Sequence, residues 1–422
     1  MNSSESDLWA DIGFTRNPYD YKPLRVNSED RLIFVGRSKE EDQFKLQVAG
    51  ANGGIVVVQG SVGVGKTSFV NAMQYDKWKK GGRRKYMPSF ETIELREKVE
   101  TSDLMLSVLS NCIFSLEKIH GSSISDGDTD LRAGKELIAN TVRSGMGFSI
   151  SILGTGGGAE RGIAPVSPAT TSLPTIMHTM DRWFDKAAEK FGYEAFLVPI
   201  NNLDILPEEA ILTFLNAARD TLLARRRVWW ILVAGPGFFL TLETKARRVS
   251  ELITGLPISL NPLTLKEVHE AIQVRVQKFK EREDAKLPVP VEAVDLLYEV
   301  SNGEFRYILK RLSDLVYSFR LAFPSERQIP IKVAKESLHL LASQKLEELN
   351  LTERERALLG KMSKKTKFRM REYSEFGFSR APRFEKPIRK FVKLGLLSRF
   401  EKTSREVWYS TNGDVNLAFA QP

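Results

Sequence analysis

The first 260 residues alternate short apolar runs with stretches of helical period. The clearest run, IVVVQ at residues 55–59, is rich in β-branched residues and typical of a strand buried on both faces. Strands that alternate with helices usually form a parallel sheet, so this part of the chain is predicted to be an α/β domain. Further strands are predicted at residues 92–95, 196–200, 228–233 and 257–260.

The pattern changes after residue 260. Residues 261–349 have a helical period throughout and predict a helical subdomain, with Pro288 and Pro290 as breaks. A third module, residues 350–422, then begins with a helix opened by Thr352. The domain boundaries are therefore predicted as 1–260, 261–349 and 350–422. The third module continues with a short helix at 371–376, a helix within 380–395 and strands at 396–400 and 407–410.

Three local features qualify this outline. Residues 121–130 and 154–175 are rich in Gly, Pro, Ser and Thr, and both are predicted to be loops. The longer loop could contact DNA or a partner, or it could be a plain insertion. Pro387 lies inside the helix predicted within 380–395, where an interior proline costs roughly 3 kcal/mol and is expected to kink or restart the helix.

Length and composition fit a folded protein of several domains. The chain has 422 residues, of which 42% are hydrophobic and 27% charged. The net charge of +9 is unevenly spread: residues 351–410 hold 17 basic against 7 acidic residues, and residues 1–350 hold 45 of each. A neutral body with a basic end is expected where one module docks on a polyanion, and the alternative is a solvated charged face.

Several classes of protein are excluded by the same sequence. A single cysteine, Cys112, cannot form an internal disulfide, and four scattered histidines give no zinc-ligand spacing. The N-terminus lacks the basic and apolar segments of a secretory signal, and the lone thiol suits a reducing compartment. The longest apolar stretch is too short to span a bilayer. We therefore expect a cytoplasmic protein without a membrane anchor.

A phosphate-binding motif lies directly after the first strand. Residues 60–67, GSVGVGKT, match G-x-x-x-x-G-K-[ST] between a buried strand and a helix, which is the context this motif requires. Glycines let the backbone amides approach the phosphates of a nucleotide, Lys66 is expected to reach the β and γ phosphates, and Thr67 to ligate Mg²⁺. The predicted cradle for ATP comprises Gly60, Ser61, Val62, Gly63, Val64, Gly65, Lys66, Thr67 and Ser68.

A P-loop site also needs a second strand that ends in acids, which hold Mg²⁺ and orient the attacking water. The candidate is AFLVPINNLD at residues 195–204, where Asn201 and Asn202 replace two carboxylates and Asp204 remains. Asn201 could accept a hydrogen bond from a metal-bound water, but Asn202 cannot take a proton. The site is predicted either to hydrolyse ATP slowly, with Asp204 or an acid from elsewhere, or to keep the nucleotide as a structural or switching ligand.

These motifs, in this order, resemble the AAA+ ATPases of the origin-recognition and initiator type and the related STAND ATPases. Asn17, Pro18 and Tyr19, followed by FVGR at residues 34–37, resemble the boxes that wrap the adenine, which implies nucleotide contacts for Tyr19, Val35 and Arg37. GEFR at residues 303–306 resembles the lid signature, which implies that Arg306 contacts the γ phosphate.

The sequence also departs from that family. The strand at 228–233 ends in Ala234, Gly235 and Pro236, so no polar side chain stands at the usual γ-phosphate sensor. Arg247 and Arg248 fall near the family's arginine-finger region and could reach the nucleotide of a neighbouring protomer, or they could be a solvated basic surface. The run of arginines just before the strand at 228–233 could serve instead: Arg225, Arg226 and Arg227. A homo-oligomer is therefore expected.

The third module resembles the winged helix of initiator-type AAA+ proteins, whose second helix enters a major groove. The favoured partner is duplex DNA, and the alternatives are a protein partner or an inert charged face. The weakened acidic strand is compatible both with an ATPase and with a protein that only binds ATP. Candidate DNA contacts are Arg380, Arg383, Lys386, Arg389, Lys390, Lys393, Lys402 and Arg405.

The expected protein is thus a DNA-associated AAA+ ATPase with three parts: a P-loop α/β domain with a parallel sheet, a helical lid and a C-terminal winged helix. Bound ATP and Mg²⁺ act as a switch in a DNA transaction such as replication initiation, transposition, or mobile-element or phage defence. The alternative is a STAND-like regulatory scaffold, in which the nucleotide is structural and the winged helix binds a protein.

Overall fold

The structure is a computed structural model that describes residues 7–49, 53–81, 85–95, 100–143, 172–403 and 406–420. Residues 154–171 of the long predicted loop lie outside this description, and the end of that stretch, from Leu173, already belongs to a helix. No helix within the described ranges is long and apolar enough to cross a membrane.

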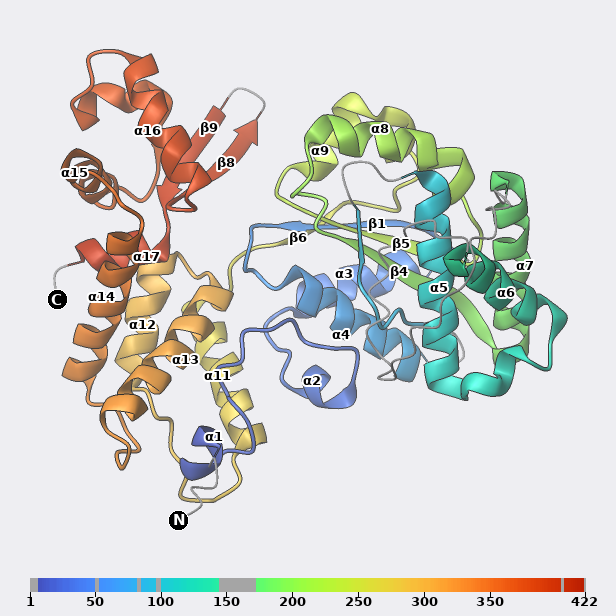
Figure 1. The fold of residues 1–422 in the computed structure, drawn as a ribbon, viewed down its shortest axis with the longest axis horizontal. Coiled ribbons are helices and arrows are strands. Elements are labelled where there is room, and N and C mark those ends of the chain that lie inside the picture. Colours follow the sequence, from blue (N-terminus) through green and yellow to red (C-terminus); the bar gives the residue numbers. More distant parts are fainter. Residues whose placement is uncertain are drawn as a thin grey trace.

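A parallel sheet forms the centre of the first domain (Figure 1). Its strand order is β2-β4-β5-β1-β6, and β3 also pairs with β4. The predicted strands are confirmed, whereas β2, only three residues long, was not predicted. The strands are β1 (Gly54–Gly60), β2 (Lys85–Met87), β3 (Ile93–Glu94), β4 (Tyr193–Asn201), β5 (Val228–Ala234) and β6 (Ile258–Leu260).

Both faces of this sheet are covered by helices. Alternate residues of β1 point to opposite faces, so Val56 and Val58 join one apolar core while Ile55 and Val57 join another. The first core includes α3 (Ser38–Val48) and α4 (Lys66–Lys79). The second includes α5 (Thr101–His120), α6 (Thr129–Arg143), α7 (Leu173–Phe191), α8 (Glu208–Ala218), η2 (Arg219–Leu223), α9 (Phe238–Lys245) and α10 (Arg247–Ser250).

The stretch 121–130 is only partly the loop that its composition predicts. A short 3-10 helix, η1 (Ser122–Ser125), occupies its first half, and α6 begins at Thr129. Asp128 accepts hydrogen bonds from the amides of Asp130 and Leu131. A side chain that caps a helix start in this way fixes the chain where composition alone indicated a mobile connection.

The lid contains the helices α11 (Leu265–Phe279), α12 (Val291–Ser301), α13 (Phe305–Ala322) and α14 (Ile331–Glu348). The start of the chain packs into the same apolar core, through Trp9 of α1 (Leu8–Asp11), Phe14 and Tyr19. Backbone bonds from Thr15 to Phe279 and from Glu281 to Gly13 tie it there. The N-terminal segment, which continues to α2 (Ser28–Leu32), therefore connects the lid to the sheet domain.

The C-terminal module has the predicted helices and a three-stranded antiparallel sheet in the order β7-β9-β8. Thr352 and Glu355 form a capping box that opens the first helix, as predicted. The expected break at Pro387 is wrong, because α16 is continuous and buries Phe384 and Ile388 on one face. The elements are α15 (Glu353–Met362), β7 (Phe368–Arg369), η3 (Met370–Phe376), α16 (Ala381–Lys393), β8 (Leu397–Thr403), β9 (Glu406–Thr411) and α17 (Gly413–Phe419).

The last helix, α17, was not predicted, and it joins the module to the lid by packing on α12 and α14. Its Asp414 is buried, accepts a 2.9 Å hydrogen bond from Nε of Arg311 and forms an ion pair with Lys345. Burial works to raise the pKa of Asp414, but the charges of Arg311 and Lys345 more than offset it, and the pKa lies below its usual range. A buried ionic cluster thus connects two domains.

Replacing Asp414 with Asn should lower the free energy of unfolding by about 2 to 3 kcal/mol at pH 7, because the buried Arg311 would lose its charged bonds to Asp414 and keep only Asp314 as a partner. Since the folded pKa is depressed, this contribution is present above about pH 4 and is lost as the pH falls through the folded value. Denaturant titrations of the wild type and D414N should therefore converge at low pH.

The exposed Asp284, which is paired with Arg327 at 3.9 Å, supplies the control. D284N should change stability by less than about 0.5 kcal/mol. Equal stability of D414N and the wild type at pH 7 would contradict the role given to the ionic cluster.

Candidate nucleotide-binding site

The predicted P-loop has the backbone that a phosphate cradle requires. It connects the end of β1 at Gly60 to the start of α4 at Lys66. Gly63 and Gly65 have φ angles of +81° and +93°, which side chains rarely tolerate. Gly65 is the N-cap and makes no side-chain capping bond. The first amides of α4, together with the helix dipole, can therefore be used to bind an anion.

Lys66 lies inside this loop. Its Nζ donates to the carbonyl oxygens of Gly60 at 2.7 Å and of Ser61 at 3.2 Å, and it lies 3.5 Å from Oδ2 of Asp204. Burial lowers the pKa of Lys66, the carboxylate of Asp204 opposes that shift, and the positive charge of Arg306 adds to it. The charge of Arg306, which comes from the lid, therefore acts on the lysine of the phosphate loop.

The turn that opens α13 of the lid contacts the P-loop directly. The amide of Arg306 lies 3.4 Å from the carbonyl oxygen of Gly63, and Glu304 packs so closely that a Cβ on Gly63 would be 2.5 Å from its Cγ. The structure thus places Arg306, predicted from its motif alone, beside the phosphate loop. It also shows that a side chain at position 63 would press against Glu304 of the lid.

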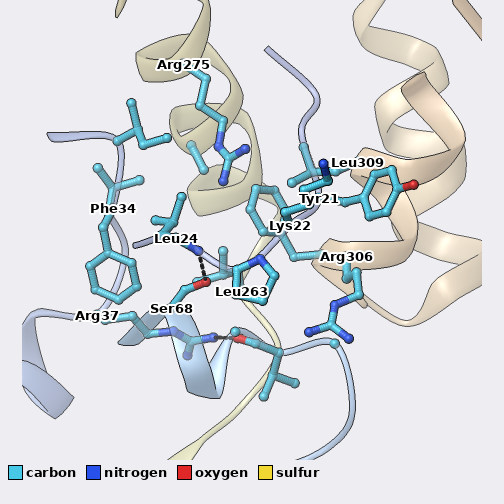
Figure 2. Close-up of a pocket in the computed structure, with 18 residues that line it drawn as sticks. Tyr21, Lys22, Leu24, Phe34, Arg37, Ser68, Leu263, Arg275, Arg306 and Leu309 are labelled. Atoms are coloured by element: carbon cyan, nitrogen blue, oxygen red, sulfur yellow. Dashed lines mark hydrogen bonds between the residues drawn. The ribbon is translucent and has the colours of Figure 1, made fainter. Parts of the chain in front are cut away.

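A pocket lies between the P-loop, the lid and the N-terminal segment (Figure 2). Of the residues predicted to bind nucleotide, Val35, Arg37, Gly63, Val64, Gly65, Ser68 and Arg306 line it. Phe34 and Phe305, which belong to the FVGR and GEFR motifs, also line it. The pocket further contains residues that the sequence did not single out: Tyr21, Lys22, Pro23, Leu24, Ile33, Leu263, Ala271, Arg275 and Leu309.

Tyr19 is not among the lining residues. It is fully buried in the lid core, with its ring 6.0 Å from that of Trp9, and Tyr21 lines the pocket two residues later. The other predicted cradle residues, Gly60, Ser61, Val62, Lys66 and Thr67, lie along the P-loop and the first turn of α4 beyond this lining.

Arg37 holds the backbone of the P-loop by a hydrogen bond. Its guanidinium is buried, donates to the carbonyl oxygen of Val64 at 3.1 Å and pairs with Glu40 at 3.3 Å. Burial lowers the pKa of Arg37 in spite of that carboxylate. The residue is therefore placed to fix the loop conformation as well as to line the pocket.

Arg275 is a lining residue that sequence reasoning missed. It is 5% exposed, donates to the carbonyl oxygen of Asp20 at 2.7 Å, and its Nε has no hydrogen-bond partner in the described part of the chain. Burial lowers its pKa to about 10. The sequence feature that could have indicated this residue is its position: Arg275 lies on the apolar face of α11, four residues from Ala271 and four from Phe279.

The end of β4 carries the predicted polar residues next to the P-loop. Asn201 is buried and its Oδ1 has no partner among the described residues. Asn202 has a left-handed φ of +58°, and its Nδ2 donates to Oε1 of Glu94 at 2.6 Å. Asp204 packs against Gly235, where a Cβ would lie 3.1 Å from its own. Because Gly235 has no side chain, Asp204 can pack against it.

These residues fit Mg²⁺ as far as their donor atoms show. The hydroxyl of Thr67, the unpartnered amide oxygen of Asn201 and the carboxylate of Asp204 are all oxygen donors, which magnesium prefers. No group of three or more His, Cys, Asp or Glu side chains that could hold a metal occurs in the described ranges. A bound magnesium ion would accordingly depend on the phosphates of the nucleotide for part of its coordination.

The two candidate finger arginines lie apart from the pocket. Arg247 and Arg248 are exposed on the short helix α10, where Arg247 is 3.4 Å from Glu251. Neither arginine is among the residues that line the pocket of the described chain.

The basic surface of α16 is present, but two of its cations already have partners. Arg389 pairs with Glu385, and Lys390 pairs with the capping residue Glu355 at 2.7 Å. The side chain of Lys402 and the whole of Arg405 lie outside the described residues. The predicted cations that are exposed and have no carboxylate partner in the described structure are Arg380, Arg383, Lys386 and Lys393.

A parallel sheet with a P-loop after its first strand, closed by a helical lid, is the architecture of AAA+ P-loop proteins. Neither a protein-family model nor a curated protein matches the sequence. Among solved structures, the ORC2 protein of Aeropyrum pernix in its ADPNP–ADP complexes is 12% identical, with a TM-score of 0.52 over 96% of both chains. The ADP form of ORC2 is 11% identical, with a TM-score of 0.50 over 95% of this chain and 94% of that one.

At this identity the similarity concerns the fold alone. The chain has the fold of an origin-recognition-type AAA+ protein over nearly its whole length, and the resemblance expected from the motifs is confirmed at that level. The predicted fold class, an α/β P-loop domain with a parallel sheet followed by helices, is also confirmed, and the winged-helix character of the C-terminal module stays a prediction.

The contact between Gly63 and the lid can be tested by paired alanine variants. G65A should cost about 1 to 2 kcal/mol of unfolding free energy, because its φ is left-handed and nothing lies within 4 Å of an added Cβ. G63A should cost about 1 to 3 kcal/mol more, because its Cβ also meets Glu304. Denaturant unfolding without nucleotide measures both.

Combining G63A with E304A should recover the extra cost. Equal destabilisation of G63A and G65A would show that Glu304 of the lid does not pack against Gly63.

Proposed function

We propose that this protein is a DNA-associated AAA+ ATPase in which bound nucleotide sets the position of the lid. The observation that carries the proposal is the convergence of Lys66 and Arg306, from the sheet domain and the lid, on one glycine loop. A triphosphate bound there would neutralise both cations and bridge the domains. The nucleotides in the structures of Aeropyrum pernix ORC2 support the choice of ligand.

Hydrolysis is proposed to be slow. Thr67, Asn201 and Asp204 would hold Mg²⁺, which supplies charge stabilisation at the phosphates when it is bound. Asn202 has no carboxylate to take a proton from water, and Asp204 lies close to Lys66. A site with this composition suits a switch that stays in the ATP-bound state for a long time.

Duplex DNA is the proposed partner of the C-terminal module. In α16, the positions 383, 386, 390 and 393 share one face, opposite the buried Phe384 and Ile388. The module is joined to the lid through Asp414, so a movement of the lid would move the basic surface as well. Nucleotide state and DNA binding would then be coupled through a shared rigid element.

Self-association is also proposed. Arg247 and Arg248 are exposed and lie outside the pocket of their own chain, so either could complete the site of a neighbouring protomer.

Nucleotide binding is tested by K66A. Loss of the lysine should weaken ATP binding by about 2 to 3 kcal/mol, or roughly 30- to 150-fold, because a charge-assisted bond to phosphate is removed. Titration calorimetry with ATP and Mg²⁺ measures this, and K79A, an exposed lysine on the same helix, is the control. Equal affinities of K66A and the wild type, or no binding by the wild type, would refute the proposed site.

DNA binding is tested by a triple variant, R383A/K386A/K393A, which leaves the ion-paired Arg389 and Lys390 in place. If each cation contacts a phosphate, the slope of log K against log salt should fall in magnitude by nearly three, and duplex affinity should fall with it. Fluorescence anisotropy at several salt concentrations measures both.

The control, K266A/K332A/K335A, removes the same charge from exposed positions of the lid. If both triple variants have the wild-type slope, α16 does not bind DNA, and the alternative of a scaffold that binds a protein partner gains support.

A further inference from the structure

Glu94 contacts Asn202, the residue that stands where a catalytic carboxylate is expected. Asn202 follows the acidic strand at the position expected for a catalytic carboxylate, and its amide cannot accept a proton from water at neutral pH. That amide donates from Nδ2 to Oε1 of Glu94 at 2.6 Å. A carboxylate from another strand is therefore held in contact with the asparagine.

The sheet places Glu94 at the correct edge. It is the last residue of β3 and pairs in parallel register with Asn201, the last residue of β4. The P-loop follows the carboxyl end of β1 in the same parallel sheet. Carboxyl ends of parallel strands meet at one edge, where α/β proteins bind their ligands. Glu94, Asn202 and the phosphate loop thus lie at the same edge of the sheet.

The surroundings of Glu94 differ from those of Asp204. Asp204 lies 3.5 Å from Nζ of Lys66, which engages its charge. Glu94 is exposed, and the only polar partner that the described residues give it is the amide of Asn202. Its second carboxylate oxygen and the amide oxygen of Asn202 remain as acceptors for a water molecule.

The backbone explains why an amide occupies position 202. Its φ of +58° lies in the left-handed region, where Asn is one of the few side chains tolerated and Glu would be strained. A carboxylate delivered by the neighbouring strand avoids that strain.

We propose that Glu94 is the proton acceptor for ATP hydrolysis, with Asn202 as the residue that positions it. This inference rests on the proposed function, since it requires ATP in the P-loop. The oxygen of a water bound by Glu94 attacks the γ phosphorus while the bond to the β,γ-bridging oxygen breaks. One proton of that water passes to Glu94, and the products are ADP and inorganic phosphate.

The test is E94Q, which keeps an oxygen for Asn202 and removes the proton acceptor. We expect kcat for ATP to fall by about 100-fold or more, with the Kd for ATP changed by less than about threefold. E91Q, at an exposed glutamate three residues earlier, should have the wild-type kcat. Asp tolerates a left-handed backbone, so E94Q/N202D should regain part of the lost rate.

The outcomes separate this inference from the proposed function. If the wild type binds no ATP, the proposed function fails. If the wild type binds ATP but does not turn it over, or if E94Q retains the wild-type kcat, nucleotide binding stands and the role of Glu94 is overturned. A loss of turnover in D204N without a loss in E94Q would assign the proton to Asp204 instead.

Discussion

The contact between a glycine loop and the turn that opens the lid is the constraint on which the rest of the molecule depends. The backbone of Gly63 lies against Glu304, and Lys66 and Arg306 add positive charge from both sides of the contact. The carboxylates of Asp204 and Glu304 lie beside these cations, and a bound phosphate would add a further anion to the same contact. The sheet domain and the lid therefore meet at a place where a triphosphate would stabilise their contact more than any neutral molecule could.

This contact can affect distant parts because the domains are tied to one another by buried groups. The N-terminal segment packs Trp9 and Phe14 into the lid and then crosses to the sheet domain. Asp414 joins the C-terminal module to the lid through Arg311 and Lys345. A buried ionic cluster of this kind adds little net stability, because burying the charges is costly. It does fix the relative position of the groups that it joins, because a buried charge that loses its partner is very unfavourable. They favour a lid and a basic module that move as one body.

The same reasoning applies to the weakened acidic strand. Substitution of the two acids by Asn201 and Asn202 looks like loss of function when the strand is considered alone. In the folded protein, Asn202 has a left-handed backbone and holds Glu94, and the bare Gly235 leaves room for Asp204. Each departure from the familiar pattern thus has a local physical consequence, and these residues lie at or after the ends of three neighbouring strands.

Local sequence determined the parts whose causes are local. The GSVGVGKT loop, the strands of the sheet other than β2 and the capping box at Thr352 follow from backbone freedom, side-chain branching and hydrogen bonds over a few residues, and the structure has them where the sequence predicts them. Only the tertiary structure decided the rest: the helix α17, the pairing of Lys390 with Glu355, Arg275 in the pocket and Glu94 beside Asn202. These features join residues far apart in the chain, and neither propensity nor spacing encodes which distant side chain will supply the partner of a buried charge.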